Sequence, residues 1–559
     1  MSSLARTWVL TADRVGARVH PLLPILVLVA VLRLWGLASM PVLYFDSGAY
    51  LGEGRFLASV AQRSVGALLH PAPDAPANPV QRVVRTLETG TAGHPPDLAK
   101  PGHAILLAMA VLVLGTSSFA AGGAVSALAG LGTVAATYAL GSAGWNRCVG
   151  IVAAVLLAIS GQHLVYSREP LVEADGLLFA TLGSLVYLRQ VTRPDAGSVR
   201  SLFGAGVLYG VAFTCNNRLS FLALSLGIVE LAVWRARGWR QWRATFVRGV
   251  ALGVGFVVPL ASIQLAYEAS RLLARANGVT PGWVDYVQQL ANFWRMNPPS
   301  RLRLDQWPTY FVDLVWMDGW PVLALSGVGL MVVLLRRSWS RAELLLVGWL
   351  LVPLVLYSTY SSGEIRMRNF SLILPWLMLT ASIGLWWLAG RARYPTAVAT
   401  VAVLALVALA LPRDMALVTA PNALPTLMGT LRQDHIEELA STNGPVLSFL
   451  VGEEHTNARL RPAFINDVAD LEQLAQRYTY IEVDMQAYWS PGQVSDRFDR
   501  AVPLFEAANG NDTWYLAFLL ESQGIRWGGW GEILDEWRHY RDQATTLRLY
   551  RLSDVLSDH

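Results

Sequence analysis

The sequence has few charged side chains, only two cysteines and a single lysine among its 559 residues. Asp, Glu, Lys and Arg make up 15% of the chain, whereas a soluble domain carries about 25%. Hydrophobic residues reach 53% and the mean hydropathy is +0.39. So little charge excludes intrinsic disorder and a coiled coil, and two cysteines are too few for a disulfide framework or a cysteine metal cluster. The composition therefore predicts an integral membrane protein with many spans.

The charge that is present is unevenly distributed. Residues 421–559 hold 21 acidic and 11 basic side chains, whereas residues 1–420 hold 19 acidic and 33 basic ones. This asymmetry indicates that the two parts lie in different compartments. The basic residues are 43 arginines and one lysine, Lys100.

Apolar runs of about 17–25 residues are long enough to cross a bilayer. The sequence predicts about eleven spans, near 21–38, 118–141, 147–165, 174–189, 201–217, 219–234, 249–267, 313–335, 343–360, 370–390 and 395–412. The apolar run 103–114 is short for a span, and a crossing there would place arginine clusters on the wrong side of the membrane. We therefore expect it to be a short helix that lies in the outer interface or re-enters it.

The arginine clusters orient these spans, because cytoplasmic loops attract arginine. They place the N-terminus in the cytoplasm and the long loops 39–117 and 268–312 outside a cell (inner or plasma) membrane. Residues 421–559 then form a small soluble extracytoplasmic α/β domain. In it we expect strands at 445–451, 478–485 and 545–552 and a helix at 467–478.

Asp46 and Glu53 follow the first predicted span in YFDSGAYLGEGRFLA. A hydrated acid at the mouth of a span explains Glu53 equally well. Asp46 has Tyr44, Phe45 and Tyr50 as neighbours, so we expect its carboxylate to be partly desolvated, with a raised proton affinity. That environment favours Asp46 as a general base over a merely hydrated acid.

Lys100 lies in HPPDLAKPG, directly before the short interfacial helix. A lone ammonium group in an arginine-rich chain favours binding of a phosphate as a point charge, and a snorkelling lysine is the alternative. The nearby His94 and His103 are more typical of structural or interfacial residues than of metal ligands.

Two further segments place charges at predicted outer helix ends. YSREPLVEADGLL contains Arg168, Glu169, Glu173 and Asp175, which indicate either a water-filled pocket or an ion-paired helix cap. IRMRNFSLILP contains Arg366 and Arg368, preceded by Glu364, and these arginines are suited to an anionic group or to lipid phosphate. No Walker loop, GxGxxG motif or zinc motif is present, so the sequence has no visible cradle for a soluble nucleotide sugar.

These four segments, in this order, resemble the motifs of the GT-C glycosyltransferases, above all the protein O-mannosyltransferase and aminoarabinose transferase branch. The resemblance covers about residues 20–412. Two positions depart from the family pattern: Ser47 follows Asp46 where a second acid is usual, and Lys100-Pro101-Gly102 replaces Lys-Pro-Pro. The first departure leaves one acid in that motif and makes a divalent metal an open question.

The resemblance implies that residues 1–420 form a GT-C transmembrane catalytic domain. It implies a glycosyltransferase that moves a sugar, with inversion, from a polyprenyl-phosphate donor to a glycan, lipid or protein hydroxyl at the outer membrane face. Asp46 would be the base, and Lys100, Arg168, Arg366 and Arg368 would bind the donor phosphate. Glu173 and Asp175 would form a second acidic site.

Two other functions fit some of the pattern. A transporter or lipid flippase would also have about a dozen spans, but its charges lie near the bilayer midplane and not at helix ends. A non-catalytic scaffold whose tail binds a partner would tolerate the substitution Asp46→Asn.

Overall fold

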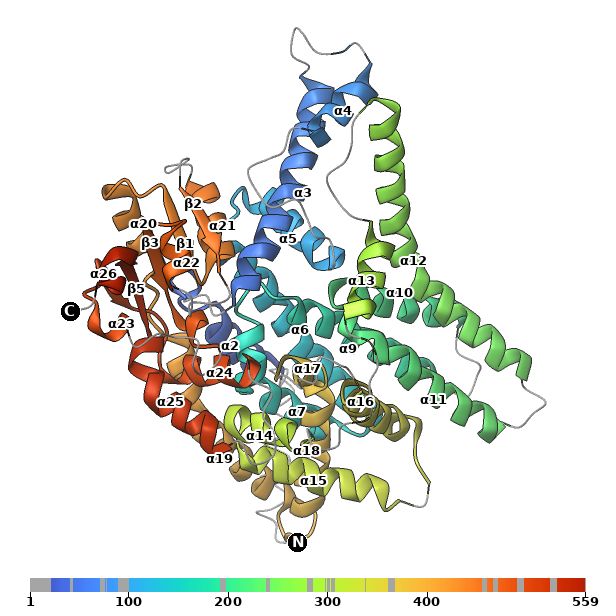
Figure 1. The fold of residues 1–559 in the computed structure, drawn as a ribbon. Coiled ribbons are helices and arrows are strands. Elements are labelled where there is room, and N and C mark those ends of the chain that lie inside the picture. Colours follow the sequence, from blue (N-terminus) through green and yellow to red (C-terminus); the bar gives the residue numbers. More distant parts are fainter. Residues whose placement is uncertain are drawn as a thin grey trace.

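The computed structural model describes residues 22–40, 44–70, 76, 78–88, 100–191, 198–237, 242–278, 285–296, 298, 302, 307–336, 338–359, 367–454, 460–465, 471–489, 497–522 and 530–557. Helices make up the part of this structure before residue 419, and a small sheet flanked by helices follows it (Figure 1). The two parts differ in secondary structure as the composition predicts.

The first half of the helical part contains twelve described segments. They are α2 (Leu22–Leu34), η1 (Leu37–Ser39), α3 (Phe45–Leu69), α4 (Pro79–Glu88), α5 (Pro101–Leu114), α6 (Phe119–Gly144), α7 (Arg147–Ala158), α8 (Gly161–Tyr166), α9 (Val172–Val191), α10 (Val199–Cys215), η2 (Asn217–Ser220) and α11 (Phe221–Arg237). The short helix α5 begins directly after Lys100, as the sequence predicts.

The second half continues with eight described helices. They are α12 (Trp242–Ala276), α13 (Tyr286–Met296), α14 (Trp307–Asp318), α15 (Trp320–Leu334), α16 (Arg341–Tyr357), α17 (Met367–Ser371), α18 (Leu374–Ala389) and α19 (Pro395–Val418). Helix α12 has 35 residues and reaches α4, so it is longer than a bilayer of about 30 Å requires (Figure 1).

Within the described residues, five helical stretches are long and apolar enough to cross a membrane: Leu22–Ser39, Phe119–Gly144, Asn217–Arg235, Trp242–Ala276 and Pro395–Val418. Several other predicted spans are divided into shorter helices. The run 147–165 breaks between α7 and α8, and the run 313–335 breaks at Gly319, whose φ of +90° suits glycine. The count of eleven spans therefore stays a prediction.

Small residues allow the helices to pack closely. A Cβ atom added at Gly206 of α10 would lie 2.3 Å from the carbonyl oxygen of Leu252 in α12. One added at Gly329 of α15 would lie 1.9 Å from that of Thr380 in α18. Backbones approach this closely only where a side chain is absent, which is how helices associate in lipid.

The tail contains a five-stranded sheet of β1 (Glu438–Ser441), β2 (Arg461–Phe464), β3 (Tyr480–Val483), β4 (Phe505–Ala508) and β5 (Thr546–Arg551). The strand order is β2-β1-β3-β5-β4. Strand β1 is parallel to β2 and β3, whereas β5 is antiparallel to β3 and β4. The helical segments of the tail are α20 (Leu424–Gln433), α21 (Gly444–Glu454), α22 (Leu471–Ala475), η5 (Met485–Trp489), α23 (Arg497–Arg500), α24 (Asp512–Ser522), α25 (Trp530–Ala544) and α26 (Leu552–Leu556).

The predicted strands at 478–485 and 545–552 correspond to β3 and β5, but the prediction of a strand at 445–451 is wrong. This segment lies in helix α21. A short apolar run does not distinguish a buried strand from a buried helix by its pattern, and here Pro445 occupies the first helical turn, where proline is tolerated.

Helix α21 joins the tail to the helical part by packing on α3 (Figure 1). A Cβ atom at Gly48 of α3 would lie 2.5 Å from the carbonyl oxygen of Pro445. Phe449 of α21 also meets Phe119 of α6 edge-on, with ring centroids 5.1 Å apart. The tail is therefore fitted against the helix that carries Asp46.

Candidate functional site

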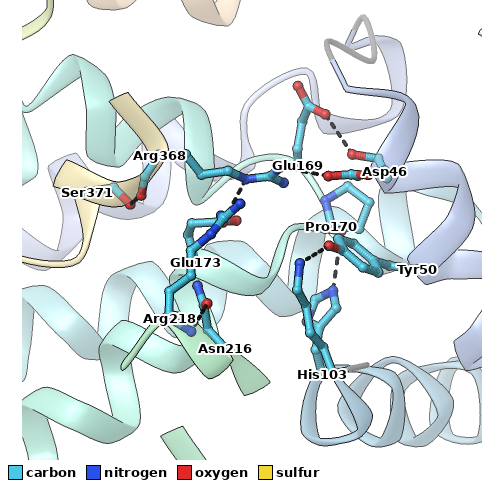
Figure 2. A network of polar contacts seen from close by, with 12 residues as sticks. Asp46, Tyr50, His103, Glu169, Pro170, Glu173, Asn216, Arg218, Arg368 and Ser371 are labelled. Carbon is cyan, nitrogen blue, oxygen red and sulfur yellow. Dashed lines mark hydrogen bonds and ion pairs between the residues drawn. The ribbon is translucent and has the colours of Figure 1, made fainter. Parts of the chain in front are cut away.

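Charged side chains from four distant segments meet around Arg368 (Figure 2). Its Nη1 donates to Asp46 Oδ2 at 2.6 Å, and its Nε donates to Glu173 Oε1 at 2.7 Å. Arg218 Nη1 donates to the same Glu173 oxygen at 3.1 Å. The chain therefore places two acids and two arginines in one alternating cluster.

Local structure fixes the two acids of this cluster. Asp46 lies in the first turn of α3 and Glu173 in the first turn of α9. The exposed N–H groups and positive dipole end of a helix favour a negative side chain in its first turn. Glu173 is 1% exposed, whereas the side chain of Asp46 is 26% exposed and accessible to a ligand.

Lys100 approaches the cluster from the start of α5. Its Nζ donates to the Tyr50 hydroxyl and lies 4.8 Å from the centre of that ring. Tyr50 is one helical turn after Asp46 in α3. Burial and the charges of Arg218 and Arg368 lower the pKa of Lys100 to about 8, and Asp46 and Glu173 oppose that change.

The glycine in Lys100-Pro101-Gly102 has a steric explanation. A Cβ atom at Gly102 would lie 2.5 Å from Thr214 Oγ1 and 2.8 Å from the backbone nitrogen of Cys215. Helix α5 therefore packs directly on the end of α10, where a second proline would collide with it.

Asp175 and His103 form a separate buried pair beside Lys100. His103 Nδ1 lies 2.6 Å from Asp175 Oδ2, and its Nε2 lies 3.3 Å from the carbonyl oxygen of Pro170. The imidazole also meets the edge of Tyr50, with ring centroids 5.3 Å apart. His103 is thus a buried packing residue, as the sequence predicts, and Asp175 faces it and not an arginine.

A second carboxylate lies close to the Asp46 motif although the motif itself contains one acid. Glu169 Oε2 accepts hydrogen bonds from Ser47 Oγ at 2.7 Å and from the backbone nitrogen of Tyr44 at 3.2 Å. Ser47 therefore contacts an acid from the loop between α8 and α9. The hydrogen bonds hold the start of α3 against that loop.

Arg168 lies against the end of helix α2. Its guanidinium group is buried, and Nη1 donates to the carbonyl oxygens of Leu32 at 2.8 Å, Arg33 at 3.2 Å and Trp35 at 2.9 Å. These carbonyls end helix α2, and carbonyls at a helix end have no partner within the helix. Arg168 therefore caps α2 through Nη1 in this structure, and its assignment to phosphate binding stays a prediction.

Glu53 is also placed differently from a hydrated acid, because it is only 6% exposed. Arg366, Glu364 and His94 lie outside the described residues.

Sequence reasoning missed Arg218 and the contact of Tyr50 with Lys100. Arg218 lies between two apolar runs, where the predicted topology expects few arginines, and this was the signal that could have found it. Tyr50 has no such signal, because its role comes from a lysine 50 residues away.

The Asp46 carboxylate responds to two opposing influences. Burial favours its neutral form, but the positive charges of Arg368 and Lys100 outweigh burial and hold the pKa of Asp46 below its ordinary value. The expectation of a raised proton affinity is therefore wrong for this state. Asp46 is ionised at neutral pH and able to accept a proton.

The acids of the site do not form a set of metal ligands. Asp46 and Glu173 face guanidinium groups, and Asp175 faces His103. Within the described part of the chain, no group of three or more His, Cys, Asp and Glu side chains is arranged to hold a metal ion. These carboxylates fit cationic partners and not a divalent metal.

One family model matches part of the chain. Residues 94–264 match the dolichyl-phosphate-mannose-protein mannosyltransferase family. This region contains Lys100, Glu173 and Arg218. No curated protein matches the chain.

Solved structures extend the comparison to most of the chain. The oligosaccharyltransferase of Archaeoglobus fulgidus in its complex with zinc and sulfate has a TM-score of 0.52 at 12% identity, over 84% of this chain and 68% of that chain. The same enzyme, AglB, with an inhibitory peptide and a dolichol-phosphate has a TM-score of 0.51 at 11% identity, over 94% of this chain and 72% of that one.

A third structure, ArnT from Cupriavidus metallidurans in the apo state, has a TM-score of 0.47 at 14% identity, over 87% of this chain and 94% of that chain. That score is too low to indicate a shared fold by itself. The chain is therefore similar to the dolichyl-phosphate-mannose-protein mannosyltransferase family over residues 94–264, and over most of its length it shares the fold of the oligosaccharyltransferase.

Proposed function

We propose that this protein transfers a sugar from a polyprenyl-phosphate donor to an acceptor hydroxyl at the outer face of the membrane, with inversion at the anomeric carbon. The observation that carries the proposal is the Arg368 guanidinium group, which contacts Asp46 on one side and Glu173 on the other. A phosphate bound to this group lies next to a carboxylate that can accept a proton.

The reaction balances with residues of this cluster. Asp46 takes the proton of the acceptor hydroxyl while that oxygen forms a bond to the anomeric carbon. The bond from the anomeric carbon to the phosphate oxygen breaks on the opposite face, and its electron pair leaves with the polyprenyl phosphate. Arg368 and Lys100 stabilise the charge that develops on the leaving phosphate.

Binding of the donor also prepares the base. Arg368 lowers the pKa of Asp46 in the donor-free protein. A phosphate that shares this guanidinium group reduces its pull on Asp46, so the carboxylate gains proton affinity when the donor is in place. The acceptor is then activated only beside a bound donor.

Three parts of the proposal go beyond the similarities to known proteins. They are the class of sugar (hexosyl or pentosyl), the identity of the acceptor, and the location of the site at the outer face of the membrane. The acceptor is a glycan, lipid or protein hydroxyl, and the tail domain at 421–559 lies on the same side as Asp46. The proposal includes no metal. The comparisons give no support to the transporter or flippase interpretation.

The test is the substitution Asp46→Asn, which keeps the size of the side chain and removes the base. Purified full-length protein in detergent is supplied with a labelled polyprenyl-phosphate sugar and crude cell-envelope acceptor. We expect turnover to fall about 10²–10⁴-fold, the usual contribution of a positioned acid or base. Glu472→Gln, which removes an exposed acid of the tail, is the control and should leave turnover unchanged.

The contrary result is also defined. If Asp46→Asn turns over like the wild type while Glu173→Gln or Asp175→Asn abolishes transfer, the base belongs to the second acidic site. If both the wild type and its variants transfer no sugar, the proposed function is wrong.

A further inference from the structure

The two oxygens of the Glu173 carboxylate differ in their hydrogen bonds. Oxygen Oε1 accepts hydrogen bonds from Arg368 Nε at 2.7 Å and from Arg218 Nη1 at 3.1 Å. Oxygen Oε2 is buried and has no hydrogen-bond partner in the described part of the chain. An arginine that pairs with a carboxylate for stability commonly engages both oxygens. Here two guanidinium groups instead converge on one anionic oxygen.

The cluster retains positive charge after these contacts are made. Asp46 and Glu173 supply two negative charges, whereas Lys100, Arg218 and Arg368 supply three positive ones. The N-terminal turn of α9 adds its positive dipole end at Glu173. These five side chains carry one net positive charge among them, which favours one more anion beside the two arginines.

Hydrogen bonds fix the backbone of Arg218, whereas its side chain remains partly accessible. Its backbone nitrogen donates to Asn216 Oδ1 at 3.1 Å, and its carbonyl oxygen accepts from the Tyr357 hydroxyl at 2.7 Å. The side chain is 20% exposed, compared with 7% for Arg368 and 1% for Glu173. A ligand that enters the cluster meets Arg218 before it meets Glu173.

We propose that Arg218 and Arg368 form a clamp for the donor phosphate, and that Glu173 occupies the phosphate position while the donor is absent. Guanidinium groups bind phosphate and carboxylate through the same planar hydrogen-bond geometry, so one can replace the other. The identity of the anion rests on the proposed function; the two-arginine clamp rests on the contacts above.

This arrangement makes Glu173 a competitor of the ligand. Removal of its charge takes one competing carboxylate away from both arginines and increases the affinity for phosphate. Removal of the Arg218 charge takes away one half of the clamp and decreases affinity. A residue that only supports the fold would not raise affinity when it is neutralised.

The experiment measures binding of undecaprenyl phosphate to full-length protein in lipid nanodiscs, without any sugar transfer. We expect Arg218→Gln to weaken the Kd at least about tenfold and Arg218→Lys to weaken it less, because lysine keeps the charge and loses the fork. Glu173→Gln should tighten the Kd several-fold. Arg248→Gln, which breaks the buried Arg248–Glu230 pair elsewhere in the structure, should leave the Kd unchanged.

Each other outcome overturns the clamp. Wild-type affinity in Arg218→Gln, or weaker binding in Glu173→Gln, contradicts it, as does a wild type that does not bind the probe. If Arg218→Gln does not fold, Glu173→Gln decides alone, because misfolding cannot raise affinity. Phosphatidylglycerol at the same concentration should not displace the probe, and full displacement would assign the arginines to ordinary phospholipid.

The clamp and the proposed transfer fail separately. If the wild type binds undecaprenyl phosphate in an Arg218-dependent manner but transfers no sugar, the clamp is supported and the proposed transfer is refuted. A wild type that transfers sugar while Arg218→Gln binds normally would do the reverse.

Discussion

Two groups of buried acids in this molecule are stabilised in opposite ways. At the candidate site, Asp46 and Glu173 both contact Arg368. In the tail, Glu482 and Asp484 are buried at the end of β3 and accept hydrogen bonds from neutral side chains. Ser441 Oγ donates to Glu482 at 2.7 Å, and Thr442 Oγ1 and Asn443 Nδ2 each donate to Asp484 at 2.9 Å.

The partners decide the charge of each group. Cations hold the pKa of Asp46 below its ordinary value despite burial. In the tail, burial raises the pKa of Glu482 well above its ordinary value, with a further contribution from the charge of Asp484, and burial also raises the pKa of Asp484. The comparison teaches that a buried acid indicates a reactive, charged site only when a cation faces it.

The largest effect is expected when the cation of the first group is removed. Arg368→Met leaves Asp46 and Glu173 partly or fully buried without their shared partner. Breaking a buried ion pair costs about 3–5 kcal/mol, so we expect a large fall in thermal stability together with loss of transfer. Thermal unfolding in nanodiscs measures the first effect. Arg497→Met, which removes an exposed tail pair with Glu472, is the control and should change little.

A smaller effect is expected where the two parts of the molecule meet. Gly48→Ala places a methyl group 2.5 Å from the carbonyl oxygen of Pro445, so the contact between α3 and α21 must shift. Overpacking of this kind costs about 1–3 kcal/mol. Gly52→Ala in the same helix meets nothing within 4 Å and should be neutral or stabilising. Equal unfolding temperatures for the two variants would contradict the tight contact.

The smallest effect is a pH dependence of the tail. Glu482 stays protonated in the folded protein at pH values where the unfolded chain has released that proton. The raised pKa of Glu482 therefore contributes its full stabilisation at pH values below the ordinary pKa of glutamate. As the pH rises, the free energy of unfolding falls by at most about 1.4 kcal/mol per pH unit for this one proton. Hydrogen exchange of β1 and β3 in the full-length protein should show less protection at pH 8 than at pH 5.

Glu482→Gln should flatten this dependence and increase protection at pH 8, because the amide has no proton to lose. Protection that rises with pH in the wild type would mean that Glu482 is ionised in the fold, and the contrast with Asp46 would then fail.

The sequence allowed much of the site to be predicted, because its acids and cations lie at the ends of apolar runs. Asp46, Lys100, Glu173 and Arg368 were all candidates, and the structure brings them together. What escaped prediction depends on contacts between distant segments. The low pKa of Asp46 comes from Arg368, which is 322 residues away.

Two features that the sequence did not predict have the same origin. The helix at 445–451 is set by packing on α3, which a run of apolar residues cannot reveal. The role of Arg168 is set by the end of α2, which lies more than 130 residues earlier in the chain. The helical architecture and the resemblance to GT-C glycosyltransferases follow from composition and motifs, whereas the partner of each charge follows only from the fold.

The hydrogen bonds from Arg168 to the end of α2 also bear on how the protein responds to its membrane. Arg168 lies in the loop before α9, the helix that carries Glu173. Its partners lie at the end of α2, which precedes α3, the helix that carries Asp46. One side chain thus fixes both segments at a common level. We therefore expect the spacing of the two acids to stay constant when lipid composition thins or thickens the bilayer.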